Sequence, residues 1–148
     1  DLNKIINDSI NLMKTNDKDI DINFDSKEIY YVNSDIDQLN RVFINLFKNS
    51  IESLKEKHEK MGNFQKKIDV EIQLINDYIN IIVKDNGTGF ANNDLGILSK
   101  PYFTTKKEGS GLGLSIVEKI LNDHNGFIEF IPQKEGARIK ILLPKYVN

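Results

Sequence analysis

Glycine is concentrated in one stretch of the chain, on either side of a polar segment. Six of the nine glycines fall within residues 87–113, and they are Gly87, Gly89, Gly96, Gly109, Gly111 and Gly113. Glycine serves where the backbone takes a positive φ angle or lies close against a ligand. Two such turns flank one loop, and the carboxylate of Asp85 opens the first of them. This arrangement predicts a nucleotide pocket.

Asp85 stands at the predicted end of a buried strand, directly before the first glycine turn. An ionised carboxylate only accepts hydrogen bonds, and it therefore suits an exocyclic amine such as that of adenine. Gly87 and Gly89 would let the backbone approach a planar base. In the alternative interpretation, Asp85 bonds the amides of its own turn and does nothing more. The Asp-x-Gly-x-Gly string alone leaves both interpretations open.

The second glycine cluster, Gly109-x-Gly111-x-Gly113, opens a helix that we predict over 112–121. Exposed amides and the axial dipole at a helix N-terminus favour phosphate. Close packing of the helix against a sheet is the alternative reason for glycine here. The spacing excludes two familiar nucleotide motifs. No G-x-x-x-x-G-K-[ST] string of a P-loop occurs, and Leu114 breaks the Rossmann G-x-G-x-x-G pattern.

Asn45 and Asn49 lie four residues apart on the longest predicted helix and therefore share one face. Their neighbours Leu46 and Phe47 belong to an apolar stripe, so two amides beside the core require partners. Mg²⁺ is one such partner, because it takes one or two protein oxygens and completes its shell with phosphate and water. A capped or solvent-facing pair of amides is the alternative.

Residues 91–110 show little periodicity, and we expect them to form a long loop that acts as a lid. Within the loop, Lys100-Pro-Tyr-Phe-Thr-Thr-Lys106 combines aromatic and polar residues. Such a segment suggests an anchor that docks when ligand closes the lid, with Lys106 reaching phosphate. A plain loop with an apolar foothold is the alternative. We expect His58 and His124 to be structural or solvated, because neither has an evident nucleophile or carboxylate partner.

The elements that position these residues follow from the periodicity of apolar residues. Ser34 is a suitable cap for the longest helix, which should end near Glu59. Asn76-Asp77 joins the two most regular strands in a hairpin, and Asn125-Gly126 should stop the last helix. We expect helices at 2–13, 35–59 and 112–121, and strands at 18–24, 28–32, 68–74, 79–83, 127–131 and 137–143.

This order of elements predicts an α/β fold in two layers, with one mixed, mostly antiparallel sheet and all helices on a single face. The other face should be partly solvated. The net charge of -2 gives no reason to expect nucleic acid as a partner. The absence of cysteine excludes disulfides and thiolate metal sites. No apolar run approaches the roughly 20 residues that a membrane span needs.

Taken in order, these stretches resemble the sequence boxes of sensor histidine kinases. Asn45-Leu-Phe-Lys-Asn49-Ser-Ile-Glu-Ser53 is similar to their N box, and Asp85-Asn-Gly87-Thr-Gly89 to their G1 box. Pro101-Tyr-Phe103-Thr-Thr-Lys106 resembles the F box, Gly109-Ser-Gly111-Leu-Gly113-Leu the G2 box, and Gly136-Ala-Arg-Ile-Lys-Ile-Leu-Leu-Pro the closing strand of the same domain. The resemblance covers nearly the whole chain and is strongest toward the nitrogen-regulation, NtrY-like, sensor kinases.

The resemblance implies a Bergerat-type ATP-binding fold, the α/β sandwich of gyrase, MutL and Hsp90-type ATPases. It implies that Asp85 holds the adenine amine and that Asn49 and Asn45 ligate Mg²⁺. Lys106 would contact the phosphates, and it would form the catalytic set together with the two asparagines. The residues implied for binding ATP are Asn45, Asn49, Asp85, Gly87, Gly89, Phe103, Thr104, Thr105, Lys106, Gly109, Gly111, Leu112 and Gly113.

The implied reaction transfers the γ-phosphoryl group of ATP to a histidine on a dimerisation hairpin, with a response regulator downstream. Neither His58 nor His124 lies in the H box of such a hairpin, and the chain opens in mid-pattern without Met. We therefore expect residues 1–148 to be the catalytic domain alone, which binds ATP but does not phosphorylate itself. We expect this domain to be monomeric and cytoplasmic and its parent protein to be a homodimer, for which an anchor in the inner membrane stays open.

Three alternatives share the same motifs. Hydrolases of the gyrase and chaperone type carry a water-activating glutamate four residues before the Mg²⁺ asparagine. Here that position is Asn45, and an amide cannot act as a general base near neutral pH. A serine kinase of the anti-sigma-factor type would differ in the acid stability of its phosphoamino acid. A degenerate binding module ranks last, because all the boxes are intact.

Overall fold

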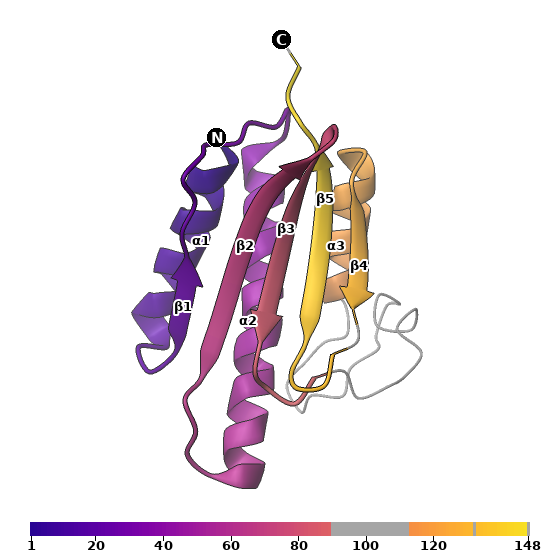
Figure 1. The fold of residues 1–148 in the computed structure, drawn as a ribbon. Helices are drawn as coiled ribbons and strands as arrows, with labels where there is room; N and C mark the ends of the chain where they lie inside the picture. The colour runs from indigo at the N-terminus through magenta and orange to yellow at the C-terminus, as the bar shows by residue number, and fades with distance from the viewer. Residues whose placement is uncertain (90–112, 132, 148) are drawn as a thin grey trace.

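A computed structural model describes residues 1–89, 113–131 and 133–147 of the chain (Figure 1). The predicted lid at 91–110 lies outside these residues. The helices are α1 (Leu2–Asn16), α2 (Ile36–Met61) and α3 (Gly113–Asp123). The strands are β1 (Asp21–Phe24), β2 (Lys67–Ile75), β3 (Tyr78–Asp85), β4 (Phe127–Ile131) and β5 (Arg138–Pro144). No described helix is both long enough and apolar enough to cross a membrane.

The described strands form one mixed sheet in the order β1-β2-β3-β5-β4. β1 and β2 pair in parallel, and the remaining neighbours pair antiparallel. A tight turn joins β2 to β3, and Asn76 in that turn takes a positive φ of 56°. The hairpin predicted at Asn76-Asp77 is confirmed. It places β3 in the centre of the sheet.

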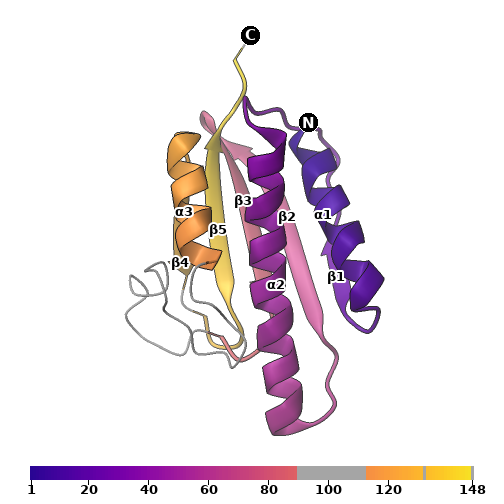
Figure 2. The same ribbon diagram turned by 180° about the vertical axis from the view of Figure 1, so that it is seen from behind.

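All three helices cover the same face of the sheet, as Figure 2 shows. On the opposite face lies no helix of the described part of the chain. Residues 79–83 of the central strand β3 are all buried, and the apolar stripe of α2 packs against this strand. The buried apolar residues of α2 are Leu39, Val42, Phe43, Leu46, Phe47, Ile51 and Leu54. The predicted two-layer α/β fold is confirmed.

The strand predicted at 28–32 is wrong. The carbonyl of Tyr30 accepts a hydrogen bond from the N–H of Leu2, at 2.8 Å, whereas the carbonyl of Tyr31 accepts one from the N–H of Tyr146, also at 2.8 Å. The two hydrogen bonds connect the segment to two different parts of the chain, whereas a strand forms a series of hydrogen bonds with one neighbouring strand. The segment is therefore an irregular connection that the two ends of the described chain hold in place.

The cap predicted for α2 is also wrong, by one residue. Asp35 is the N-cap, and its carboxylate accepts the N–H of Gln38 at 3.2 Å. Ser34 and Asp35 are both of a type that caps helices, so propensity does not choose between them. At its other end α2 continues two residues beyond the predicted Glu59, to Met61, where Gly62 takes a φ of 80°.

α3 ends at Asp123, two residues beyond the predicted end at 121, and the predicted stop at Asn125-Gly126 is confirmed. Asn125 has a φ of 57°, and the N–H of Gly126 donates to the carbonyl of Leu121 at 2.7 Å. A Cβ atom at Gly126 would lie 2.6 Å from the carbonyl oxygen of Leu142. Because only glycine fits so close to the neighbouring strand, the chain can turn directly from α3 into β4.

Candidate nucleotide-binding site

Asp85 is the last residue of β3, and its side chain is buried at 7 % exposure. Its Oδ1 atom accepts hydrogen bonds from the N–H of Gly87 at 2.9 Å and from the N–H of Ala137 at 3.3 Å. The bond to Gly87 is the one that the turn interpretation predicts. An ionised carboxylate has about four acceptor positions. Bonding the turn is therefore compatible with accepting the amine of a base.

Three glycines allow the backbone around Asp85 to pack closely. A Cβ atom at Gly87 would lie 2.3 Å from the Oγ of Ser53, and one at Gly89 would lie 2.7 Å from the carbonyl oxygen of Gly136. Gly136 has a φ of 75°, and its Cβ would lie 1.8 Å from the carbonyl oxygen of Asp85. Any other residue would push these backbone segments apart. The glycines thus set the close packing of the turn.

Asn45 and Asn49 lie on α2 and are both half-buried. The Oδ1 atom of Asn45 lies 3.9 Å from the position that a Cβ of Gly113 would occupy, at the start of α3. The structure therefore brings one predicted metal ligand to the second glycine cluster. Ser53 and Lys57 continue the same four-residue spacing along the helix. We call Asn45, Asn49, Ser53 and Lys57 the polar stripe of α2.

The second half of the polar stripe binds the first glycine turn. The Oγ of Ser53 accepts the N–H of Thr88 at 2.9 Å and shares a 3.0 Å hydrogen bond with the hydroxyl of Thr88. The Nζ of Lys57 donates to the carbonyl of Asn86 at 2.8 Å. One helix thus contacts residues of both glycine clusters, which are far apart in sequence.

Sequence reasoning gave no role to Ser53 or Gly136, although both lie within the quoted motifs, and it missed Lys57 altogether. The four-residue spacing that relates Asn45 to Asn49 was a usable signal, since it extends to Ser53 and Lys57. Seven predicted residues lie outside the described part of the chain, so that their predicted roles stay predictions. They are Phe103, Thr104, Thr105, Lys106, Gly109, Gly111 and Leu112.

The donor groups fit the expected ligands. Asn45 and Asn49 offer amide oxygens, which Mg²⁺ accepts alongside phosphate and water. Within residues 1–89, 113–131 and 133–147, no group of three or more His, Cys, Asp or Glu side chains could hold a metal ion. The buried acceptor Asp85 fits an adenine amine.

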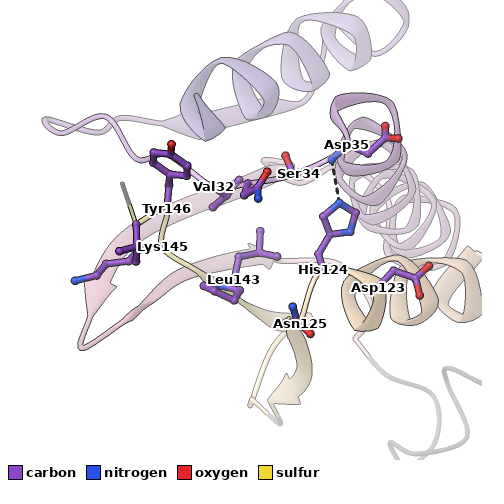
Figure 3. A pocket seen from close by; sticks show the side chains of 12 residues that line it. Val32, Ser34, Asp35, Asp123, His124, Asn125, Leu143, Lys145 and Tyr146 are labelled. Atoms are coloured by element: carbon purple, nitrogen blue, oxygen red, sulfur yellow. Dashed lines mark hydrogen bonds between the residues drawn. The ribbon is translucent and has the colours of Figure 1, made fainter.

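A hollow of about 530 Å³ lies at the end of the sheet opposite to Asp85 (Figure 3). His124 lies beside it, and its Nε2 accepts the N–H of Asp35 at 3.0 Å. Its Nδ1 lies 2.8 Å from the carbonyl of Ile120, so the hydrogen sits on Nδ1. His124 thereby joins the end of α3 to the start of α2, which agrees with a structural histidine. No predicted site residue lines this hollow.

Comparison with known proteins places the chain among ATP-binding domains. The family model described as histidine kinase-, DNA gyrase B- and HSP90-like ATPase matches residues 34–147. A putative NtrY-like sensor histidine kinase of Rickettsia bellii is 34 % identical over 140 residues, which are 94 % of this chain and 22 % of that protein. Sensor histidine kinase ZraS of Escherichia coli K12 is 32 % identical over 148 residues, 97 % of this chain and 30 % of that protein.

A solved structure matches over the same range. The nucleotide-free catalytic domain of histidine kinase ThkA superposes with a TM-score of 0.83 at 28 % identity, covering 97 % of this chain and 92 % of that one. The chain thus spans less than a third of the curated relatives named above but nearly all of this catalytic domain. These matches confirm the resemblance that the sequence motifs predicted.

Proposed function

The chain belongs to the family of histidine kinase-, DNA gyrase B- and HSP90-like ATPases, and we propose that it binds Mg-ATP and donates the γ-phosphoryl group to a histidine of a separate dimerisation domain. Its relatives are sensor histidine kinases, and this domain is their ATP-binding catalytic part. Asn45 is the residue that favours a phosphate donor over a hydrolase.

Asn45 is half-buried on α2, facing the start of α3 at Gly113. A hydrolase needs a base at the attacking water, and an amide neither gains nor loses a proton near neutral pH. A phosphate donor needs no such base of its own, because the acceptor histidine supplies the nucleophile. The chemistry left to this chain is positioning and charge neutralisation, which dominate phosphoryl transfer.

The described residues divide this work between two ends of the pocket. Asp85 accepts the adenine amine, while Gly87 and Gly89 keep the turn beside it closely packed. Asn45 and Asn49 orient the phosphate end by holding Mg²⁺ through their amide oxygens. The cation neutralises charge on the phosphates when bound. Lys106 and the second glycine cluster complete the phosphate side in this proposal.

The larger assembly follows from the same proposal. Residues 1–148 act as one catalytic domain with a lid at about 91–110. Its partners are the histidine-bearing dimerisation domain of the same kinase and a downstream response regulator. We place this domain in the cytoplasm as a monomer and its parent protein in a homodimer, while a membrane anchor of the parent protein stays open. The relatives are more than three times as long as this chain, which leaves room for a dimerisation domain.

The test combines the purified chain with a dimerisation hairpin of an NtrY-like relative and ATP labelled on its γ-phosphate. We expect label on the hairpin only, in an acid-labile form, and none on the chain incubated alone. Acid-stable label would instead indicate a serine kinase. Rapid release of free phosphate without the hairpin would indicate a hydrolase, and either result would overturn the proposal.

The metal assignment has its own test. Asn49→Ala should bind ATP with the same affinity in Mg²⁺ and in excess chelator, at the weak level that the parent shows without Mg²⁺. If Asn49→Ala binds ATP in Mg²⁺ as tightly as the parent does, the amide has no metal role. Asn40→Ala is a matched control, because Asn40 lies on the same helix outside the polar stripe.

A further inference from the structure

We propose that Lys57 is a positioning residue of the nucleotide site, which orients Asp85 without contacting the nucleotide itself. This inference rests on the proposed function, because it concerns the adenine end of the same pocket. Lys57 lies on α2, three turns beyond Asn45 along the polar stripe. None of the sequence motifs includes it.

The ammonium group of Lys57 has three partners. Its Nζ donates to the carbonyl oxygen of Asn86 at 2.8 Å and to the Oε1 of Glu135 at 2.8 Å, and it lies 4.7 Å from the centroid of the Phe64 ring. The side chain of Lys57 is only 12 % exposed, whereas that of Glu135 is 69 % exposed. Solvent screens the ion pair more than the bond to the half-buried turn. The carbonyl of Asn86 is therefore the important partner.

That carbonyl belongs to the same peptide plane as the N–H of Gly87. Lys57 holds the oxygen of this plane, and Asp85 Oδ1 accepts its N–H at 2.9 Å. Because a peptide unit is rigid, fixing its oxygen also fixes the direction of its N–H. Lys57 thus orients the carboxylate of Asp85 through one intervening peptide.

The rest of the turn is held independently of Lys57. The Oδ1 of Asn86 accepts the N–H of Lys67 at 2.9 Å, and its Nδ2 donates to the carbonyl of Gln65 at 2.7 Å. These bonds tie the side chain of Asn86 to the start of β2. Loss of Lys57 should therefore free the peptide plane to rotate while the turn keeps its place. The fold should survive the substitution.

Glu135 extends the same restraint to a second segment. It directly precedes Gly136, which packs against the carbonyl oxygen of Asp85. Lys57 consequently binds both chain segments that enclose Asp85, the turn after β3 and the connection before β5. A single cation joins α2 to the two walls of the adenine end. Its removal should affect recognition of the base more than recognition of the phosphates.

The test compares Lys57→Met and Lys57→Arg with the parent chain, and Lys60→Met is the matched control. Lys60 lies on the same helix, is exposed, and pairs only with Glu56 among the described contacts, at 3.2 Å. Lys57→Met keeps an apolar stem and loses the charged group that lies over Phe64. We expect it to weaken ATP binding about tenfold, equivalent to about 1.4 kcal/mol. Lys57→Arg should retain most of the affinity, and Lys60→Met should equal the parent.

Two further readouts separate positioning from simple loss of stability. The ratio of the GTP to the ATP dissociation constant should fall in Lys57→Met, because the base-binding carboxylate loses its orientation. In the nucleotide-free chain, the amide of Gly87 should exchange hydrogen faster than in the parent, while the amide of Ile81 in β3 should not change.

The outcomes distinguish this inference from the proposed function. A parent chain that binds no adenine nucleotide would overturn the proposed function, whatever Lys57 does. A parent that binds ATP, together with a Lys57→Met variant of equal affinity and equal base selectivity, would overturn the positioning role. Weaker binding with an unchanged GTP-to-ATP ratio and unchanged Gly87 exchange would also overturn it, because it would reveal a general loss of stability.

Discussion

Helix α2 has polar contacts at both ends, and the two ends differ in what those contacts bind. At the N-terminal end, Asp35 caps the helix, and His124 accepts the N–H of Asp35 while bonding the last turn of α3. Each of these contacts satisfies a backbone group at a helix terminus. In the C-terminal half, Ser53 and Lys57 instead bind the backbone of a turn from another element.

The difference explains why the hollow at the N-terminal end of α2 is not where we place the chemistry. The hollow beside His124 is open, yet the bonds of His124 and Asp35 next to it complete the local ends of α2 and α3. Around Asp85 the backbone is packed so closely that three glycines are required. There, the side chains of Ser53 and Lys57 bind the turn after β3, which is not the end of a helix. We therefore place the binding site by what the polar side chains bind, and not by the volume of a hollow.

We expect the largest loss of stability from Gly136→Ala, which tests the close packing around Asp85. The new Cβ would collide with the carbonyl oxygen of Asp85, in a backbone of φ 75° that alanine rarely adopts. We expect a loss of stability of about 3 kcal/mol, seen as a fall in Tm of roughly 10 °C. Gly62→Ala is the control, because Gly62 has a φ of 80° but nothing within 4 Å of its Cβ position. Equal losses would show that the collision does not matter.

Asp85→Asn tests the adenine end directly. The substitution keeps the size of the side chain and removes the charge from its acceptor. We expect ATP affinity to fall about 30-fold, or about 2 kcal/mol, as measured by titration calorimetry. Asp69→Asn makes the same change on the neighbouring strand β2, and it should leave ATP affinity unaltered. An Asp85→Asn variant with parental affinity would refute the adenine assignment.

Asp35→Ala probes the opposite end of α2. Loss of the cap should cost about 1 kcal/mol of stability, lowering the Tm by about 4 °C. ATP affinity at a temperature well below the transition should not change, because the cap lies far along the helix from the polar stripe. A fall in ATP affinity here would show that the two ends are coupled, contrary to the comparison.

The smallest effect is expected from acid titration of the Lys57–Glu135 pair. The Lys57 ammonium, through its hydrogen bond and its charge, holds the pKa of Glu135 below the usual value of 4.5. A depressed pKa contributes stability that is complete above about pH 4.5 and disappears as the pH falls through the folded value. The Tm of Glu135→Gln should lie slightly below that of the parent at pH 7 and coincide with it near pH 2. A constant difference across that range would refute the pairing.

The parts of the fold that sequence predicts are those set by neighbours along the chain. Periodicity located the hairpin at Asn76-Asp77 and the long helix that carries Asn45 and Asn49, and glycine spacing located the turn after Asp85. These patterns repeat within a few residues, and patterns of that range predict helices and strands.

The parts that sequence did not predict depend on distant partners. Lys57 meets Asn86 across 29 residues of sequence and Glu135 across 78. The four-residue spacing of the polar stripe includes Lys57, but nothing local shows which carbonyl or carboxylate it binds. The cap of α2 was misplaced for a similar reason. Ser34 and Asp35 both suit that position, and the structure selects Asp35, whose N–H also bonds the remote His124.

The polar stripe of α2 fixes the distance between its contacts with the two glycine clusters. Asn45 and Lys57 are twelve residues apart, which corresponds to about 18 Å along a helix axis. Their relative direction is fixed by the helical repeat, which turns about 100° per residue. One residue inserted between Asn49 and Ser53 would rotate Ser53 and Lys57 away from their turn while leaving Asn45 in place beside Gly113. The contacts of α2 with both glycine clusters thus depend on the number of residues between Asn49 and Ser53.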